Sequence, residues 1–241
     1  MIFTLSPAAS KIMTTIALNL QAVRGRIERA ARESGRTASA VSLLAVSKTV
    51  PASYIEEARR AGQTAFGESY VQEAVKKITA LQADAFEWHF IGPIQSNKTR
   101  AIAEHFQWVH AVDRDKIAAR LSEARPSELP PLNVCIQVNV SGEASKSGVE
   151  PGREIALAEA ISALPRLRLR GLMAIPEPTD DMGLQRKRYA RLRELKDALS
   201  AAGYALDTLS MGMSDDLEAA IAEGATIVRV GTAIFGARER I

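Results

Sequence analysis

A lysine at the end of an apolar run is the first residue of the sequence that suggests covalent chemistry. Lys48 closes a run that begins at Val41, and Val50-Pro51 interrupts the pattern directly afterwards. A short apolar run bounded by proline predicts a strand buried on both faces, as in a parallel sheet. Desolvation lowers the pKa of a lysine amine from about 10.4 and frees its lone pair, so Lys48 is a candidate Schiff-base former towards an aldehyde or ketone. The alternative is a lysine that extends from the strand end into solvent.

Two later segments have the residue types of an anion site. Ser210 and Thr232 offer hydroxyl groups, and Gly212 and Gly231 allow backbone N–H groups to approach a ligand closely. The segment 232–235 could also begin a short helix, whose N-terminus favours an anion. The alternative is that both glycines only form tight turns.

Arg229 stands within a predicted strand otherwise made of apolar residues, so its guanidinium points either into the sheet's interior or towards the covering helices. A structural salt bridge is one interpretation, and donation to a ring nitrogen or ligand oxygen is the other. Lysine, phosphate site and inward arginine together fit pyridoxal 5′-phosphate, a cofactor with an aldehyde and a phosphate. A sugar-phosphate aldolase that uses a lysine Schiff base would share the first two features.

The elements that position these residues alternate regularly. Apolar runs predict strands near 41–47, 64–67, 87–91, 107–111, 132–138, 167–173, 206–210 and 226–230. Amphipathic patterns predict helices near 52–61, 70–81, 97–105, 114–124, 152–163, 183–201 and 215–223. About eight strand–helix units in this length predict a (β/α)₈ barrel, whose sites form at the carboxyl ends of the strands. A doubly wound open sheet is the alternative, but the first predicted strand has no glycine-rich turn after it.

One extra helix precedes the first strand. An apolar stripe from Ile16 to Ile27 predicts a helix that ends near Ser34-Gly35. Residues 1–12 differ in pattern from the rest of the chain, so we expect a disordered extension, a natural start at Met13 and a single barrel domain over 13–241. Ser214-Asp215-Asp216 predicts a cap and an acidic first turn for the helix near 215–223.

Composition excludes several classes of function. The net charge is only +3, and no basic stripe with interleaved aromatic residues indicates nucleic-acid binding. The three histidines, His89, His105 and His110, lack the spacing of a metal site. Cys135 is the single cysteine and stands in an apolar run, which predicts a core residue in a reducing, cytoplasmic compartment. No run reaches the length of a membrane span, and no signal-peptide pattern is present.

Long motifs, in order, resemble the pyridoxal phosphate homeostasis protein family. They lie at 45–49 (AVSKT), 66–73 (FGESYVQE), 88–98 (WHFIGPIQSNK), 138–142 with 146–148, 171–174, 209–216 (LSMGMSDD) and 228–232 (VRVGT). The resemblance covers nearly all of the chain from Met13 to Gly236. It implies a fold like the N-terminal barrel of alanine racemase. Ser69 departs from the family's usual asparagine; serine is shorter, so a water molecule could replace a direct contact there.

The resemblance also implies roles for particular residues. Lys48 would form the Schiff base with pyridoxal 5′-phosphate, and Arg229 would face the pyridine nitrogen. The phosphate would be held by Ser210, Gly231 and Thr232, and the cofactor pocket would be lined by Ser69, His89 and Met211.

The resemblance implies a cofactor carrier without firm catalytic activity, whose transient partners would be apo-enzymes that need the cofactor. A guanidinium keeps its proton and leaves the pyridine nitrogen unprotonated, which weakens the ring as an electron sink. The chain also ends at Ile241 with no room for the β domain that completes the racemases, so we expect a monomer. The alternative is a racemase or lyase that uses the same cofactor. Lys146 is considered as a second, transient attachment point.

Overall fold

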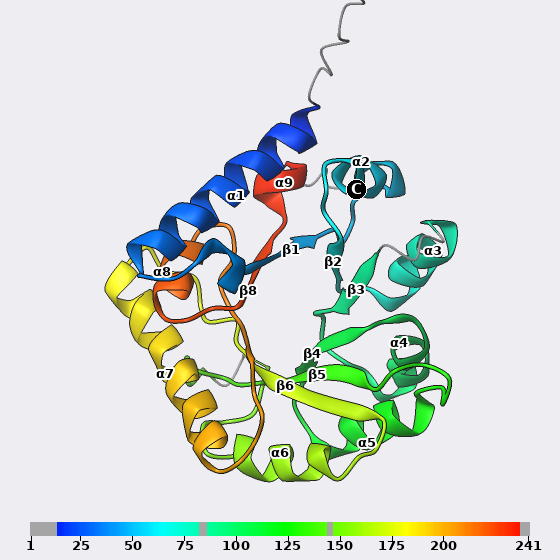
Figure 1. Cartoon of the computed structure of the whole chain (residues 1–241). Coiled ribbons are helices and arrows are strands. Elements are labelled where there is room, and N and C mark those ends of the chain that lie inside the picture. Colours follow the sequence, from blue (N-terminus) through cyan, green and yellow to red (C-terminus); the bar gives the residue numbers. More distant parts are fainter. Residues whose placement is uncertain (1–13, 82–85, 144–146, 237–241) are drawn as a thin grey trace, which may run out of the picture.

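Eight parallel strands close into a barrel in the computed structural model, which describes residues 14–81, 86–143 and 147–236 (Figure 1). The strands are β1 (Ser42–Val46), β2 (Ala65–Glu68), β3 (Glu87–Phe90), β4 (Trp108–Val112), β5 (Leu132–Gln137), β6 (Leu167–Met173), β7 (Thr208–Ser210) and β8 (Ile227–Val230). Each strand pairs with the next one along the chain, and β8 pairs with β1. The predicted (β/α)₈ barrel is therefore confirmed.

The pairing of the first strand with the last one is what closes the sheet. Leu44 lies beside Arg229, and Ala45 lies beside Val230. Parallel strands in register bring their carboxyl ends to the same mouth of the barrel, so the residues after β1 and after β8 are neighbours although the chain separates them widely.

Helices surround this sheet (Figure 1). They are α1 (Thr15–Glu33), α2 (Ala52–Arg60), α3 (Val71–Leu81), α4 (Thr99–His105), α5 (Asp115–Ala124), α6 (Glu154–Ser162), α7 (Met182–Ala201), α8 (Leu217–Ala222) and α9 (Thr232–Phe235), with short 3₁₀ helices at η1 (Ala38–Ala40) and η2 (Ser96–Lys98). The predicted extra helix is α1, whose cap Thr14 accepts a hydrogen bond from the N–H of Ala17. It packs against α2, α8 and α9 and so covers the seam where β1 meets β8.

Successive strand residues point to opposite faces of the sheet. On β3, Phe90 points outward and meets Phe106 edge-on, with ring centroids 5.4 Å apart. His89 points the other way and forms a hydrogen bond with His110 of β4 inside the barrel. The outward residues form the apolar layer under the helices, while the inward positions of several strands carry polar groups.

Two predicted boundaries shift for local reasons. α8 begins at Leu217 because the Asp216 carboxylate accepts hydrogen bonds from the Met213 N–H and the Tyr189 hydroxyl, and its backbone keeps a non-helical φ of −137°. Asp216 thus ties the preceding turn to α7. The helix expected over 97–105 starts as the 3₁₀ helix η2 and continues as α4. The expectations for residues 1–12, Met13 and Lys146 fall outside the described residues.

Candidate functional site

The carboxyl-end mouth of the barrel gathers most of the residues singled out from the sequence. Lys48 follows β1, Ser69 follows β2, Met211 and Gly212 follow β7, and Gly231 and Thr232 follow β8. Lys48 and Ser69 are partly buried, whereas Met211 is fully buried. The barrel topology therefore brings together side chains that lie more than 180 positions apart in the sequence.

The backbone next to Lys48 is held in an uncommon conformation. Thr49 has a φ of 65°, in the left-handed region that β-branched residues rarely adopt. Its N–H donates to the Glu73 carboxylate at 2.6 Å, and its hydroxyl donates to the Lys48 carbonyl at 2.6 Å. These bonds fix the turn at which the chain leaves β1, and with it the start of the Lys48 side chain.

A buried ionic cluster supports this turn from behind. The Glu68 carboxylate accepts hydrogen bonds from the Ser47 hydroxyl at 2.7 Å and from the Lys77 ammonium at 2.9 Å. Lys77 also donates to the Ser47 carbonyl and to Glu73. Burial raises the pKa of Glu68, and the neighbouring Lys77 opposes that rise. Sequence reasoning missed this cluster, although Lys77 stands four residues after Glu73 in α3, which is the spacing of a helical ion pair.

The two glycine turns at the mouth differ in how tightly they are enclosed. Gly212 has a φ of +91°, and a Cβ there would lie 2.5 Å from the Cβ of Ala220. A Cβ at Gly231 would lie 3.1 Å from the Val46 carbonyl oxygen, so this glycine lets the end of β8 approach the end of β1. The carbonyl of Gly212 accepts the N–H of Arg229 at 2.9 Å, which ties the first turn to β8.

Arg229 points into the barrel. Its guanidinium donates to the Ser210 carbonyl at 2.6 Å, to the Ser210 hydroxyl at 2.7 Å and to the Ala174 carbonyl at 2.8 Å. Among the residues that the structure describes, no carboxylate forms an ion pair with it, so the salt-bridge interpretation is not supported. Burial lowers the pKa of Arg229, and Tyr189 and Asp216 partly offset this shift. Arginine still keeps its charge, so a permanent cation lies inside the barrel.

Two histidines continue the hydrogen bonding from Ser210 through the interior. Nδ1 of His110 lies 2.7 Å from the Ser210 hydroxyl, and Nε2 of His110 lies 2.9 Å from Nδ1 of His89. Nε2 of His89 lies 2.7 Å from the Glu87 carboxylate. The sequence singled out His89 but assigned no role to His110 or Glu87. Both histidines are flanked by apolar residues in buried strands, and that pattern predicts polar groups facing inward.

The segment after β3 packs closely on Ser69. A Cβ at Gly92 would lie 2.4 Å from the Ser69 carbonyl oxygen, so only glycine permits this approach. Tyr70, the next residue, is 55% exposed and leaves the mouth. The geometry holds the Ser69 backbone at the rim between β2 and β3.

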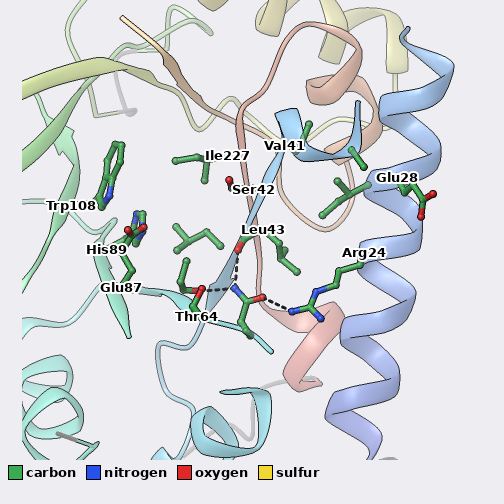
Figure 2. A pocket seen from close by; sticks show the side chains of 15 residues that line it. Arg24, Glu28, Val41, Ser42, Leu43, Thr64, Glu87, His89, Trp108 and Ile227 are labelled. Carbon is green, nitrogen blue, oxygen red and sulfur yellow. Dashed lines mark hydrogen bonds and ion pairs between the residues drawn. The ribbon is translucent and has the colours of Figure 1, made fainter. Parts of the chain in front are cut away.

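A cavity of about 560 Å³ opens at the opposite, amino-end mouth. Figure 2 shows Glu87, His89 and Trp108 along one side and Arg24 and Glu28 of α1 along the other. Gln63 links α1 to β1, because it accepts a hydrogen bond from Arg24 and donates one to the Leu43 carbonyl. Of the residues singled out as cofactor ligands, this cavity contains only His89.

The described part of the chain lacks the features of a metal site and of a membrane span. It contains no group of three or more His, Cys, Asp or Glu residues arranged to hold a metal ion. None of its helices combines the length and the apolar composition that a membrane span requires.

Comparison with known proteins first defines the class. Residues 18–239 match the family described as alanine racemase, N-terminal domain, and the chain belongs to that family. The alanine racemase of Corynebacterium glutamicum shares the barrel fold, with a TM-score of 0.68 over 93% of this chain and 60% of the racemase at 17% identity.

Nearer relatives define the subgroup. The pyridoxal phosphate homeostasis protein of Pseudomonas aeruginosa is 64% identical over 94% of this chain and 97% of its own length. The protein of the same name from Escherichia coli is 55% identical over 94% of this chain and 98% of its own length. PipY of Synechococcus elongatus, solved with PLP bound, has a TM-score of 0.80 and 36% identity, covering 92% of this chain and 100% of PipY. The chain is therefore a member of the pyridoxal phosphate homeostasis protein family.

Proposed function

We propose that this chain binds pyridoxal 5′-phosphate through a Schiff base on Lys48 and keeps the free cofactor in balance as a carrier. The observation that carries the proposal is the pairing of β1 with β8. This pairing supports the proposal because it brings the end of β1, just before Lys48, next to the turn at Gly231-Thr232, so an amine and a turn suited to an anion would share one mouth of the barrel.

The donor set fits this cofactor. Lys48 supplies the amine for the aldehyde, while the hydroxyl groups of Ser210 and Thr232 and the backbone at Gly231 would hold the phosphate. Ser210, Met211 and Arg229 lie under the same mouth, and Ser69 lies at its rim. When bound, the cofactor supplies an aldehyde for amines and a ring that withdraws electrons.

The protein's own residues limit that second property. Arg229 would face the pyridine nitrogen as a donor and would not give up its proton, so the ring nitrogen stays unprotonated. A weak electron sink suits storage and delivery better than racemisation. Apo-enzymes that need the cofactor are the proposed recipients, and a cytoplasmic location and a monomeric state belong to the same proposal.

The visible spectrum, borohydride reduction and peptide mapping test the attachment. We expect a yellow protein whose colour is lost on reduction, with the pyridoxyl group on Lys48. Lys48→Ala should abolish the adduct, whereas Lys76→Ala, on the exposed face of α3, should leave it intact. A colourless protein after addition of excess cofactor would overturn the proposal and favour a cofactor-free aldolase.

Solvent exchange of an amino acid's α-hydrogen distinguishes a carrier from a racemase or lyase. The carrier proposal predicts no exchange above the rate with free cofactor. Exchange that requires Lys48 would contradict it.

A further inference from the structure

A continuous hydrogen-bonded chain crosses the barrel from one mouth to the other. It runs through Arg229, Ser210, His110, His89 and Glu87, with successive heavy-atom distances of 2.7, 2.7, 2.9 and 2.7 Å. The three middle residues are 0–2% exposed. The Glu87 side chain is 51% exposed and lines the amino-end cavity (Figure 2).

At the carboxyl-end mouth of the barrel, Arg229 sets the donor-to-acceptor direction of this series of hydrogen bonds. Arg229 can only donate, so the Ser210 oxygen accepts from it. No other acceptor is recorded for the Ser210 hydroxyl among the described residues, so its proton goes to Nδ1 of His110. A neutral His110 then carries its own proton on Nε2 and donates to His89.

At the amino-end mouth of the barrel, Glu87 independently sets the same direction of hydrogen bonding. The hydrogen bond from His89 is the main cause that lowers the pKa of Glu87, so this carboxylate is ionised and only accepts. His89 must therefore carry its proton on Nε2, which leaves Nδ1 as the acceptor for His110. Burial lowers the pKa of both histidines, so each ring is neutral and holds one proton.

The single proton of Ser210 creates a conflict with phosphate binding. A hydroxyl has one donor, and here it is used by His110. If Ser210 donates to a phosphate oxygen, as the proposed function requires, Ser210 must accept from His110 instead. His110 must then hold its proton on Nδ1, His89 must do the same, and His89 Nε2 faces Glu87 with a further proton between them.

This inference rests on the proposed function. We propose that a phosphate bound at the carboxyl-end mouth reverses the donor and acceptor roles along these hydrogen bonds, and that one additional proton is then held between Glu87 and His89 at the opposite mouth. A proton enters at the Ser210 oxygen as the hydroxyl proton moves to His110. The Nε2 proton of His110 moves to Nδ1 of His89, and the Nε2 proton of His89 becomes shared with Glu87. The hydrogen-bonded groups from Ser210 to Glu87 then hold four protons instead of three. A phosphate monoanion supplies the fourth below its second pKa of about 6, and water supplies it above.

Other charged or titratable groups lie near the hydrogen-bonded residues from Arg229 to Glu87 and affect their protonation. Arg170 favours the ionised form of Glu87, and Asp207 pairs with Arg170 at 2.6 Å. The groups that face the chain or its amino-end cavity are, by element, Arg24 and Glu28 of α1, Cys135 of β5, Arg170 of β6, Tyr189 of α7, and Asp207 and Asp216 of the segments around β7. All of them remain in the control variant below.

Ring tautomers, read from ¹⁵N NMR of histidine-labelled protein, test the reversal directly. We expect His89 and His110 to carry Nε2 protons in the free protein and Nδ1 protons after addition of pyridoxal 5′-phosphate. His105 is an internal reference, because its Nδ1 faces the Ala101 carbonyl at 2.9 Å outside the barrel. Pyridoxal, which has the aldehyde and no phosphate, should leave both inner rings unchanged.

The pH dependence of the affinity for the cofactor provides a second test, because proton uptake is linked to binding. Between pH 7 and 8 the affinity for pyridoxal 5′-phosphate should fall about tenfold per pH unit more steeply in the wild type than in Glu87→Gln, the slope that uptake of one proton gives. A glutamine amide can either donate to or accept from His89, so the variant can reverse its chain without an added proton.

The outcomes separate the two proposals. A yellow protein whose inner rings keep their Nε2 protons, or whose pH slope equals that of Glu87→Gln, would overturn the reversal and leave cofactor binding intact. Failure to bind the cofactor at all would overturn both.

Discussion

The ammonium nitrogen of Lys77 lies 2.7 Å from the carbonyl oxygen of Ser47, the residue that precedes Lys48. One buried cation thereby joins α3 to the end of β1 and neutralises Glu68 at the end of β2. The position from which Lys48 projects depends on a second lysine that has no place in the proposed chemistry.

Removal of Lys77 should be severe because it leaves the fully buried Glu68 carboxylate without its cation. We expect Lys77→Met to lower the free energy of unfolding by about 3–5 kcal/mol, measured by urea denaturation at pH 7. Lys76→Met, at an exposed neighbouring position, should change it by less than about 0.5 kcal/mol. Equal effects of the two substitutions would show that the buried pair is not what stabilises this corner.

Alanine substitutions at Gly212 and Gly203 distinguish the cost of a left-handed backbone from the cost of steric overlap. Both have positive φ, +91° and +100°, but a Cβ at Gly203 meets nothing within 4 Å, whereas one at Gly212 lies 2.5 Å from Ala220. Gly203→Ala should cost about 1–2 kcal/mol for the left-handed backbone alone. Gly212→Ala should cost about 1–3 kcal/mol more from the overlap, and it should also weaken cofactor binding at the adjacent turn. Thermal unfolding of the two variants checks the difference, and equal costs would contradict it.

The fold was accessible from the sequence because each strand–helix unit shows its own period. Eight apolar runs separated by amphipathic segments predict a barrel, and the barrel rule then predicts which mouth carries Lys48 and Thr232. The extra helix and the short helix at Thr232 follow from local patterns as well. Boundaries failed where a side chain overrides propensity, as at Asp216 before α8.

The interior hydrogen-bonded chain could not be predicted in the same way. His89 and His110 stand 21 positions apart, and no spacing rule connects them. Their contact depends on β3 and β4 being neighbours, on the shear between these strands and on both rings facing inward. The orientation of Arg229 likewise required the register of β8 against β1, which a single sequence does not state.

Cys135 should be inert in the folded protein. It is fully buried on β5, and burial raises the pKa of its thiol to about 12. The thiolate is the reactive form, so we expect no alkylation by iodoacetamide at pH 8 in the native state and rapid alkylation in urea. Mass spectrometry of the intact protein measures the adduct. Fast native labelling would show that β5 opens to solvent.

The two inner histidines should make the protein sensitive to mild acid. Burial lowers the pKa of His89 and of His110 in the folded state, so below the ordinary value near 6.5 the unfolded chain binds protons that the folded chain does not. Stability is therefore fully present above pH 6.5 and is lost as the pH falls below it, with a slope approaching about 2.7 kcal/mol per pH unit for two groups.

Urea denaturation between pH 7 and 5.5 measures this slope. His110→Asn keeps a polar side chain in the barrel and removes one titrating ring, so its slope should be smaller by up to about 1.4 kcal/mol per pH unit. Wild type and variant with parallel pH profiles would mean that His110 gains its proton without unfolding, and that the interior chain accommodates a charged ring.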